Sequence, residues 1–157
     1  MLIPIPDLLR ARRLLCVQPH YDDNDICAGG TIARLALAGA EVHYLTVTDD
    51  LVGVLDRRLS DAAARARLAD EQDRAGREIG VRAQHRLGFP DAGEWSAFAL
   101  RREVVRHLRE IRPDFVLTVD PWLPYEAHQD HVRTGISTAE ACLLFGLPRF
   151  PSGDPGL

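Results

Sequence analysis

Residues 13–38 read RLLCVQPHYDDNDICAGGTIARLALA, and this stretch decides the fold. Its first part, from Arg13 to Gln18, is a short apolar run typical of a buried strand. Its last part, from Asp25 to Ala38, places apolar residues along one stripe of a helix. A strand that leads into a helix is the unit from which parallel sheets are built, so this stretch predicts one such unit.

The same unit recurs along the rest of the chain. Strands are expected over residues 41–47 and 115–119, with a weaker strand signal over residues 85–88. Helices are expected over residues 60–79, 98–111 and 130–145. The alternation predicts an α/β fold, a Rossmann-like three-layer sandwich in which helices cover both faces of a mainly parallel sheet. Ligands of such sheets bind beyond the carboxyl ends of the strands, so the loops there are where a site is expected.

Length, charge and cysteine content narrow the class of protein. The 157 residues suit one domain, and their net charge of −4 is unlike the basic footprint of a nucleic-acid-binding protein. No run approaches the ~20 consecutive apolar residues of a membrane-spanning helix. Cys16, Cys27 and Cys142 form no C-x-x-C pair, and their odd number suits a reducing, cytoplasmic environment. We expect neither nucleic acid nor membrane as a partner, and the sequence leaves a homo-oligomer open.

Missing residue types exclude several kinds of chemistry. All nineteen basic residues are arginine, so no lysine is available for a Schiff base, pyridoxal phosphate or a Walker phosphate loop. Serine occurs four times and never in the G-x-S-x-G motif of nucleophile-elbow hydrolases. An enzyme of this composition would have to rely on Asp, His, a metal or a cofactor.

His and Asp residues gather directly after two of the expected strands. Residues 18–25 read QPHYDDND and residues 120–131 read DPWLPYEAHQDH, so both groups lie at the carboxyl edge of the sheet. His20, Asp23 and His131 supply two imidazoles and a carboxylate, which suit a zinc ion with a position left open for water. Asp22 is then free to act as a general base, although spacing alone does not separate the roles of His128 and His131.

Each group of residues has a simpler explanation when it is taken alone. Acids next to a helix start stabilise the helix N-terminus without any further function. Two independent helix caps have no reason to bring histidines to the same sheet edge, so the pair favours a metal site. The alternative is a non-catalytic nucleotide- or ligand-binding module on the same Rossmann-like fold. Two other histidines are expected outside the site, His43 as a structural strand residue and His107 on a solvated helix face.

Three segments together resemble the PIG-L/LmbE family of zinc-dependent N-acetylglucosaminyl deacetylases. They are PHYDDNDICAGGTIA at residues 19–33, LGFPD at residues 87–91 and AHQDHVRTG at residues 127–135. The resemblance covers residues 14–144, but Tyr21 and Gln129 stand where the family motifs carry proline. Members of the family run well beyond the end of this chain. The resemblance therefore implies a single domain, residues 1–157, that lacks the C-terminal part of the family fold.

The resemblance also assigns roles to individual residues. It implies His20, Asp23 and His131 as metal ligands and Asp22 as the general base. It implies that His128 faces the oxyanion or protonates the leaving amine and that Asp130 orients the catalytic histidine. Three residues are candidates for substrate contact: Arg67 from the second helix, Tyr21 as part of the pocket lining, and Trp122, whose alternative role is loop packing.

The activity implied by the resemblance is hydrolysis of the amide of an N-acetylated (or otherwise N-acylated) amino sugar or related glycoconjugate. The products would be acetate and a free amine. Zinc is the expected cofactor, and iron or cobalt would suit the same donors. A thiol-precursor glycoside or an antibiotic is the alternative class of substrate.

Overall fold

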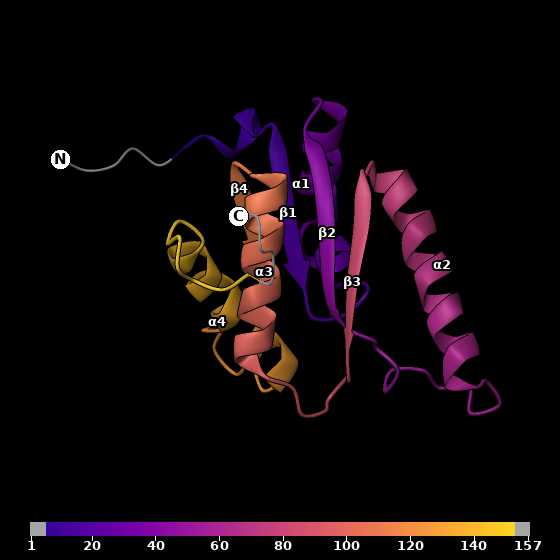
Figure 1. Cartoon of the computed structure of the whole chain (residues 1–157). Helices are drawn as coiled ribbons and strands as arrows, with labels where there is room; N and C mark the ends of the chain where they lie inside the picture. The colour runs from indigo at the N-terminus through magenta and orange to yellow at the C-terminus, as the bar shows by residue number, and fades with distance from the viewer. Residues whose placement is uncertain (1–5, 153–157) are drawn as a thin grey trace.

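The computed structural model describes residues 6–152, in which strands and helices alternate (Figure 1). After a short 3-10 turn at Leu8–Arg10, the elements follow in the order β1 (Arg13–Gln18), α1 (Asp23–Leu37), β2 (Glu41–Thr48), α2 (Asp61–Ile79), β3 (Ala83–Phe89), α3 (Ala97–Ile111), β4 (Phe115–Thr118) and α4 (Gln129–Leu144). Every strand and helix expected from the sequence is present. The strand with the weak sequence signal, expected over residues 85–88, extends over Ala83–Phe89 as β3. Its pairing with β2 stabilises a strand that its own residue types only weakly favour.

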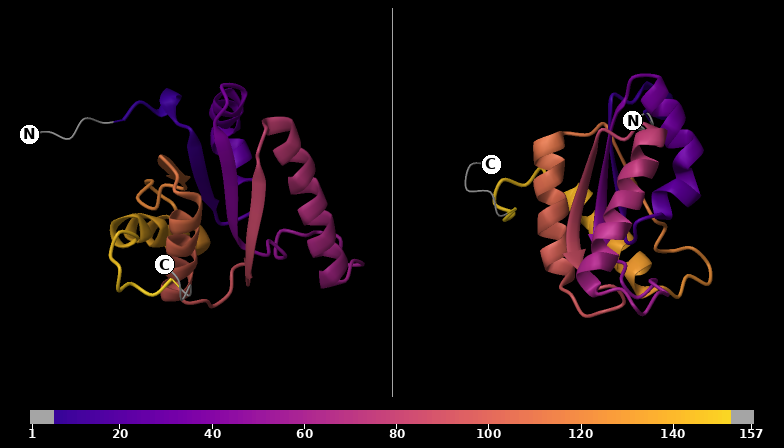
Figure 2. Two further views of the ribbon diagram at one scale, coloured as in Figure 1. Left: turned by 45° about the horizontal axis from the view of Figure 1, so that its top comes forward. Right: turned by 90° about the vertical axis from the view of Figure 1, so that its right-hand side faces the viewer.

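The strands form one parallel sheet in the order β3-β2-β1-β4. In the register of this sheet, Leu14 of β1 lies opposite Val42 of β2 on one side and Phe115 of β4 on the other. Seen along the sheet, α1 and α2 cover one face and α3 the opposite face (Figure 2). The predicted α/β fold class, with helices on both faces of a parallel sheet, is confirmed.

The core has two layers because the side chains of β1 alternate between the two faces. Leu15 and Val17 are fully buried against α3 and α4, in a cluster that includes Val104 and Leu108. Leu14 and Cys16 point the other way and pack against α1. The central strand is therefore buried on both faces, from Leu14 to Gln18.

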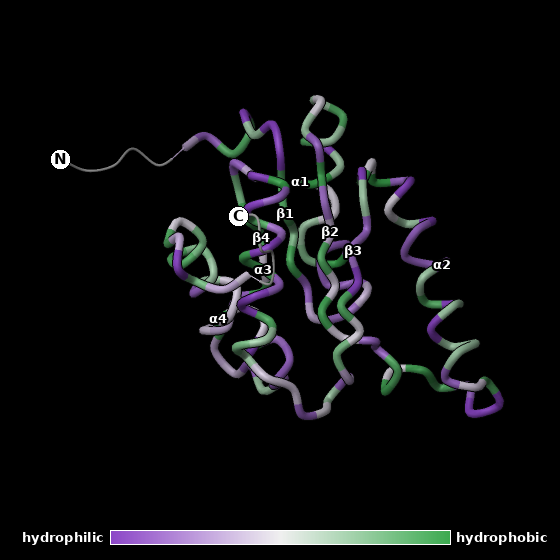
Figure 3. The backbone as a smooth tube through the Cα atoms, in the orientation of Figure 1, coloured by the Kyte–Doolittle hydropathy of each residue, from purple (hydrophilic) through white to green (hydrophobic). Residues whose placement is uncertain are grey.

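Hydropathy distinguishes the central strands from the outer helices (Figure 3). Hydrophobic residues concentrate in β1 and β2, whereas α2 alternates between hydrophilic and hydrophobic turns. Two ion pairs run along α2, Arg67 with Glu71 and Arg74 with Asp70. Among residues 6–152, no helix has both the length and the apolar character that crossing a membrane requires.

Gly135 lets α4 approach the loop that follows β4. A Cβ atom at this position would lie 2.7 Å from the carbonyl oxygen of Val119 and 2.6 Å from Cδ of Pro121. Contacts this short are not tolerated, so the close packing of α4 on this loop requires glycine. The loop and the first turn of α4 carry His128 and His131.

Gly135→Ala is expected to lower the free energy of unfolding by about 1–3 kcal/mol, because backbone and a rigid proline ring have to move. Gly30→Ala is the matched control. Its new Cβ meets nothing within 4 Å, so alanine should stabilise α1 by up to about 1 kcal/mol. Urea denaturation of both variants measures the difference, and equal effects would show that the close approach does not constrain α4.

Three histidines stack between the sheet and α3. His43 of β2 and His85 of β3 are stacked with ring centroids 5.5 Å apart, and His107 of α3 meets His85 edge-on at 4.9 Å. His107 is only 2% exposed, so the prediction that it lies on a solvated face is wrong. Its Nδ1 is 2.7 Å from the carbonyl oxygen of Glu103 one turn earlier, which satisfies the ring inside the core.

The pKa of His85 is lowered to about 4, first by burial and then by the neighbouring His107, His43 and Arg106. Between pH 6.5 and 4 the unfolded chain binds a proton at this position and the folded chain does not. The contribution of His85 to stability is therefore complete above pH 6.5 and is lost as the pH falls through 4.

His85→Gln is expected to make the protein less sensitive to acid. The wild type should lose about 1–2 kcal/mol more than the variant between pH 7 and pH 4, a figure reduced from the full shift because the ring is partly exposed. Urea denaturation at the two pH values measures this difference. Equal losses in the two proteins would contradict the assignment.

Candidate metal centre

The candidate site lies where the loops after β1 and β4 meet. These strands are neighbours in the sheet, while β2 lies on the other side of β1. The chain therefore leaves the carboxyl ends of β1 and β4 toward opposite faces, which opens a crevice of the kind that holds ligands in α/β sheets. Both His- and Asp-rich segments of the sequence are at this crevice.

The buried amide of Gln18 fixes the first of these loops. Its Oε1 accepts a hydrogen bond from the backbone N–H of Asn24 at 2.8 Å, and its Nε2 donates to Oγ1 of Thr46 at 3.0 Å. One side chain thus connects the end of β1, the first turn of α1 and the neighbouring strand. This places His20 and Asp23 at a defined position above the sheet.

His20, Asp23 and His131 come together although they are far apart in the sequence. Nδ1 of His20 lies 3.4 Å from Oδ2 of Asp23, and Nε2 of His131 lies 3.4 Å from Oδ1 of Asp23. These separations are longer than good hydrogen bonds. They match the spacing of about 3.3 Å between donors that each lie about 2.0–2.1 Å from one tetrahedral ion. The three residues therefore fit a metal such as zinc in both chemistry and spacing.

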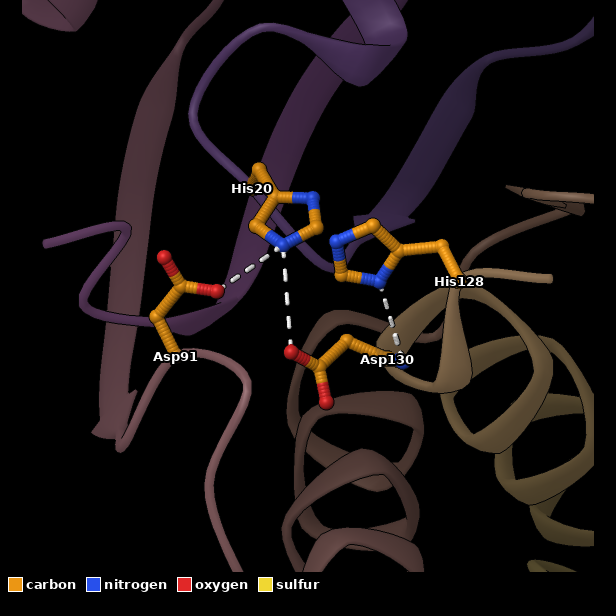
Figure 4. A group of neighbouring side chains, drawn as sticks. All are labelled: His20, Asp91, His128 and Asp130. Carbon is orange, nitrogen blue, oxygen red and sulfur yellow. Dashed lines mark hydrogen bonds and ion pairs between the residues drawn. The ribbon is translucent and has the colours of Figure 1, made fainter. Parts of the chain in front are cut away.

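A second group of potential donors shares His20 (Figure 4). Nε2 of His20 lies 3.3 Å from Oδ1 of Asp91 and 3.9 Å from Oδ2 of Asp130, and the ring of His128 stands edge-on at 4.6 Å. Oδ2 of Asp130 also accepts a hydrogen bond from the backbone N–H of Ala92 at 2.8 Å. The other oxygen of Asp130 is buried without a hydrogen-bond partner among residues 6–152.

The acids around His20 determine its charge. Burial alone would lower the pKa of His20, but its close contact with the Asp23 carboxylate, together with the charges of Asp50 and Asp91, raises it to about 9. Burial would raise the pKa of Asp23, and its contacts with His20 and His131 lower it instead. Burial raises the pKa of Asp50. A metal at this centre would replace a proton on His20, as is usual for imidazole ligands.

A cavity of about 490 Å³ borders the site at His20, which lines it, whereas Asp23 and His131 do not. Its polar lining consists of His20, Asp22, Asp50, Asp91 and His128. Asp22 occupies the N-cap position of α1, but its side chain makes no capping hydrogen bond. Its carboxylate therefore remains available to a molecule in the cavity.

None of the three residues expected to contact substrate lines this cavity as the structure describes it, so the prediction that Tyr21 lines the pocket is not met. Arg67 pairs with Glu71 at 2.8 Å and lines an adjoining cavity of about 350 Å³, which shares Gly53 and Leu68 with the first. The ring of Tyr21 lies 5.7 Å from the guanidinium of Arg86. Trp122 lies in the loop after β4 and is 73% exposed.

Three further acids lie at the site that were not predicted from the sequence: Asp50, Asp91 and Glu126. Asp50 follows β2 and Asp91 follows β3, so both lie at the same sheet edge as the residues that were selected. Asp91 also ends the LGFPD segment. Glu126 lies within the second His- and Asp-rich segment, and its Oε2 is 3.1 Å from Nδ1 of His131. The rule that ligands bind at the carboxyl edge, applied to every strand, would have found the first two.

Left-handed backbone conformations occur in each of the loops that follow β2, β3 and β4. Asp50 has φ 54°, Ala92 has φ 50° and Tyr125 has φ 70°. Residues other than glycine rarely adopt this conformation, and such strain concentrates at functional sites. At Ala92 the conformation aims the backbone N–H at Asp130.

Fold and site together define the class: an α/β protein with a His/Asp metal-type centre at the carboxyl edge of a parallel sheet. Residues 15–142 match the family model PIG-L, described as GlcNAc-PI de-N-acetylase, and the chain belongs to this family.

Named relatives agree with this membership. The chain is 39% identical over 143 residues to diacetylchitobiose deacetylase of Thermococcus kodakarensis, covering 91% of this chain and 54% of the relative. It is 34% identical over 176 residues to 1D-myo-inositol 2-acetamido-2-deoxy-alpha-D-glucopyranoside deacetylase of Rhodococcus erythropolis, covering 92% of this chain and 58% of the relative. The solved N,N'-diacetylchitobiose deacetylase of Pyrococcus horikoshii superposes with a TM-score of 0.86 at 38% identity, over 92% of this chain and 54% of that one. The chain thus spans just over half the length of these relatives.

Ala92→Gly is expected to raise the free energy of unfolding by up to about 1 kcal/mol, because glycine adopts φ 50° without the steric cost that alanine bears. Ala66→Gly is the control, since position 66 is an exposed interior position of α2, where glycine should cost about 1 kcal/mol. Thermal or urea denaturation compares the two variants. A loss of stability in both would argue against strain at position 92.

Proposed function

We propose that this chain is a metal-dependent N-deacetylase that releases acetate from an N-acetylated amino sugar or a related glycoconjugate. The observation that carries the proposal is the set of His20, Asp23 and His131, whose donor atoms have the spacing of metal ligands beside the free carboxylate of Asp22. Relatives named as deacetylases support a hydrolase over a non-catalytic binding module.

His20, Asp23 and His131 would hold the ion, and we propose zinc because two imidazoles and one carboxylate suit it. When bound, zinc acts as a Lewis acid that lowers the pKa of water and polarises a carbonyl group. Asp22, which lines the cavity, takes the proton of the attacking water as general base.

His128 supplies a hydrogen-bond donor to the other side of the reacting amide. Its Nδ1 accepts the backbone N–H of Asp130 at 3.3 Å, so the proton of the neutral ring is on Nε2, which points toward His20 (Figure 4). This N–H can bind the oxyanion. The proton that Asp22 takes from the attacking water passes to the leaving amine, directly or by way of His128, so the ring ends the reaction neutral. Asp130 orients His128 through this backbone contact, and its own position is set by Ala92.

The substrate is proposed to extend beyond the cavity over the centre. Arg67 of the adjoining cavity offers a guanidinium to hydroxyl or charged groups on the rest of the molecule. Tyr21 lies beside the metal ligands, and the exposed ring of Trp122 offers a surface for stacking on a sugar. Diacetylchitobiose and the inositol glycoside named for the two relatives are the first compounds to try.

We also propose the domain organisation and the cellular location of this activity. We propose that residues 1–157 form one domain, of which residues 15–142 match the family model. The free thiols of Cys16, Cys27 and Cys142 support a reducing, cytoplasmic location.

Metal content and acetate release together test the proposal. Elemental analysis of the wild type is expected to give about one zinc per chain, and His131→Ala should lose it because the ligand set is broken. His43→Ala is the control, since His43 lies in the separate histidine stack. Absence of metal from the wild type after reconstitution would overturn the proposal.

Asp22→Asn separates catalysis from metal binding. This variant should keep its zinc and lose acetate release by about 10²–10⁴-fold, the usual contribution of a general base. Wild-type protein that binds zinc but releases no acetate from either compound would restrict the proposal to a metal-binding domain. Full activity of Asp22→Asn would remove Asp22 from the mechanism.

A further inference from the structure

Each of the two histidines in the candidate ligand set has a second carboxylate on its far side. His20 faces Asp23 with Nδ1 and Asp91 with Nε2, at 3.4 Å and 3.3 Å. His131 faces Asp23 with Nε2 and Glu126 with Nδ1, at 3.4 Å and 3.1 Å. The same arrangement therefore occurs twice, with the two ring nitrogens exchanged.

The carboxylate of Asp91 is held in place from several directions. Its side chain is only 5% exposed, and its Oδ2 accepts the backbone N–H of Val52 at 2.8 Å. Its own backbone N–H donates to Oδ1 of Asp49 at 3.1 Å. The loops after β2 and β3 thus fix the oxygen that meets His20 in Figure 4.

Glu126 is held in a similar way by the loop after β4. Its Oε1 accepts the backbone N–H of His128 at 2.7 Å, which leaves Oε2 directed at His131. The side chain is 17% exposed, and the residue before it, Tyr125, has the left-handed backbone described above. The bond to the main chain therefore holds the carboxylate in the orientation that faces His131.

Such a contact determines which ring nitrogen is free. A neutral imidazole has one N–H and one lone pair, and a carboxylate draws the N–H to its own side. The other nitrogen then presents its lone pair to a metal, with increased basicity. Here that nitrogen is Nδ1 on His20 and Nε2 on His131, the two atoms that face Asp23.

We propose that Asp91 and Glu126 are positioning residues for the metal ligands, each holding one histidine in the tautomer that binds. The ion is then bound by Nδ1 of His20 and Nε2 of His131. This inference rests on the proposed function, because it requires that the centre binds a metal.

An alternative is that Asp91 is itself a ligand, together with His20, His128 and Asp130. The hydrogen bonds and ion pairs that Asp91 and Asp130 already make argue against this second ligand set. Both oxygens of Asp91 already have partners, and Oδ2 of Asp130 is bound to Ala92. Binding there would also use Nε2 of His20 rather than Nδ1, so the two arrangements can be distinguished by experiment.

Nitrogen-15 NMR of the zinc-loaded wild-type chain tests the tautomers directly and needs no variant. The expected result is a proton on Nε2 of His20 and on Nδ1 of His131, with zinc on the opposite nitrogens. Zinc on Nε2 of His20 would overturn the inference and favour Asp91 as a ligand. A wild type that binds no zinc would overturn the proposed function as well.

Zinc affinity of variants tests the energetic role. Asp91→Asn and Glu126→Gln are each expected to weaken binding 10–100-fold while one zinc per chain is retained. Glu94→Gln is the matched control, because Glu94 is an exposed carboxylate in the same loop as Asp91 and contacts Arg133 rather than a histidine. Competition with a chromophoric chelator measures the affinities.

Cobalt absorption distinguishes positioning from ligation. The cobalt-loaded variants should keep the wild-type band pattern, since the set of ligands is unchanged. A changed pattern in Asp91→Asn would mark Asp91 as a ligand and overturn the inference. Zinc affinities within twofold of the wild type in both variants would also overturn it.

Discussion

The parallel pairing of β1 with β4 is the constraint on which the rest of the site depends. It places a buried central strand between two neighbours whose loops diverge at its carboxyl end. Side chains that follow β1 meet side chains that follow β4 only because of this order. This strand order produces the crevice and places His20 within reach of donors from both loops. It also brings α4 against the loop after β4, at Gly135.

His20 is the centre of the site's electrostatics. It is nearly buried, and the carboxylates of Asp23 and Asp91 lie against its two ring nitrogens. Their negative charges are therefore only partly screened by solvent. Such a collection is costly without a cation to balance it. A divalent ion, which the donor set fits, would supply that balance, and it would explain why so many acids are placed in one crevice.

The sequence carried most of the fold and the main chemical groups. Apolar runs and helical stripes predicted the elements, and the motifs predicted that residues near 20 and near 130 would meet. They could not predict the backbone conformations of the loops. Asp91 contacts His20 from a turn in which Ala92 has a left-handed backbone. Alanine does not favour that conformation, so the sequence does not predict the turn. The prediction for His107 was wrong for a related reason, because its burial depends on packing against His85 of β3, which is distant in the sequence.

The distance along the chain between the two halves of the site has a consequence for how the protein reaches its native state. The contact between Leu14 and Phe115 joins segments that are far apart in sequence, and closing so long a loop is entropically costly and slow. Before β4 docks, His20 and Asp23 are present but His131 is elsewhere, so a partly folded chain holds only an incomplete set of donors. An ion that needs all three selects the fully paired sheet and stabilises it by mass action. A metal bound by this set would therefore act late in folding, stabilising the completed sheet rather than nucleating it.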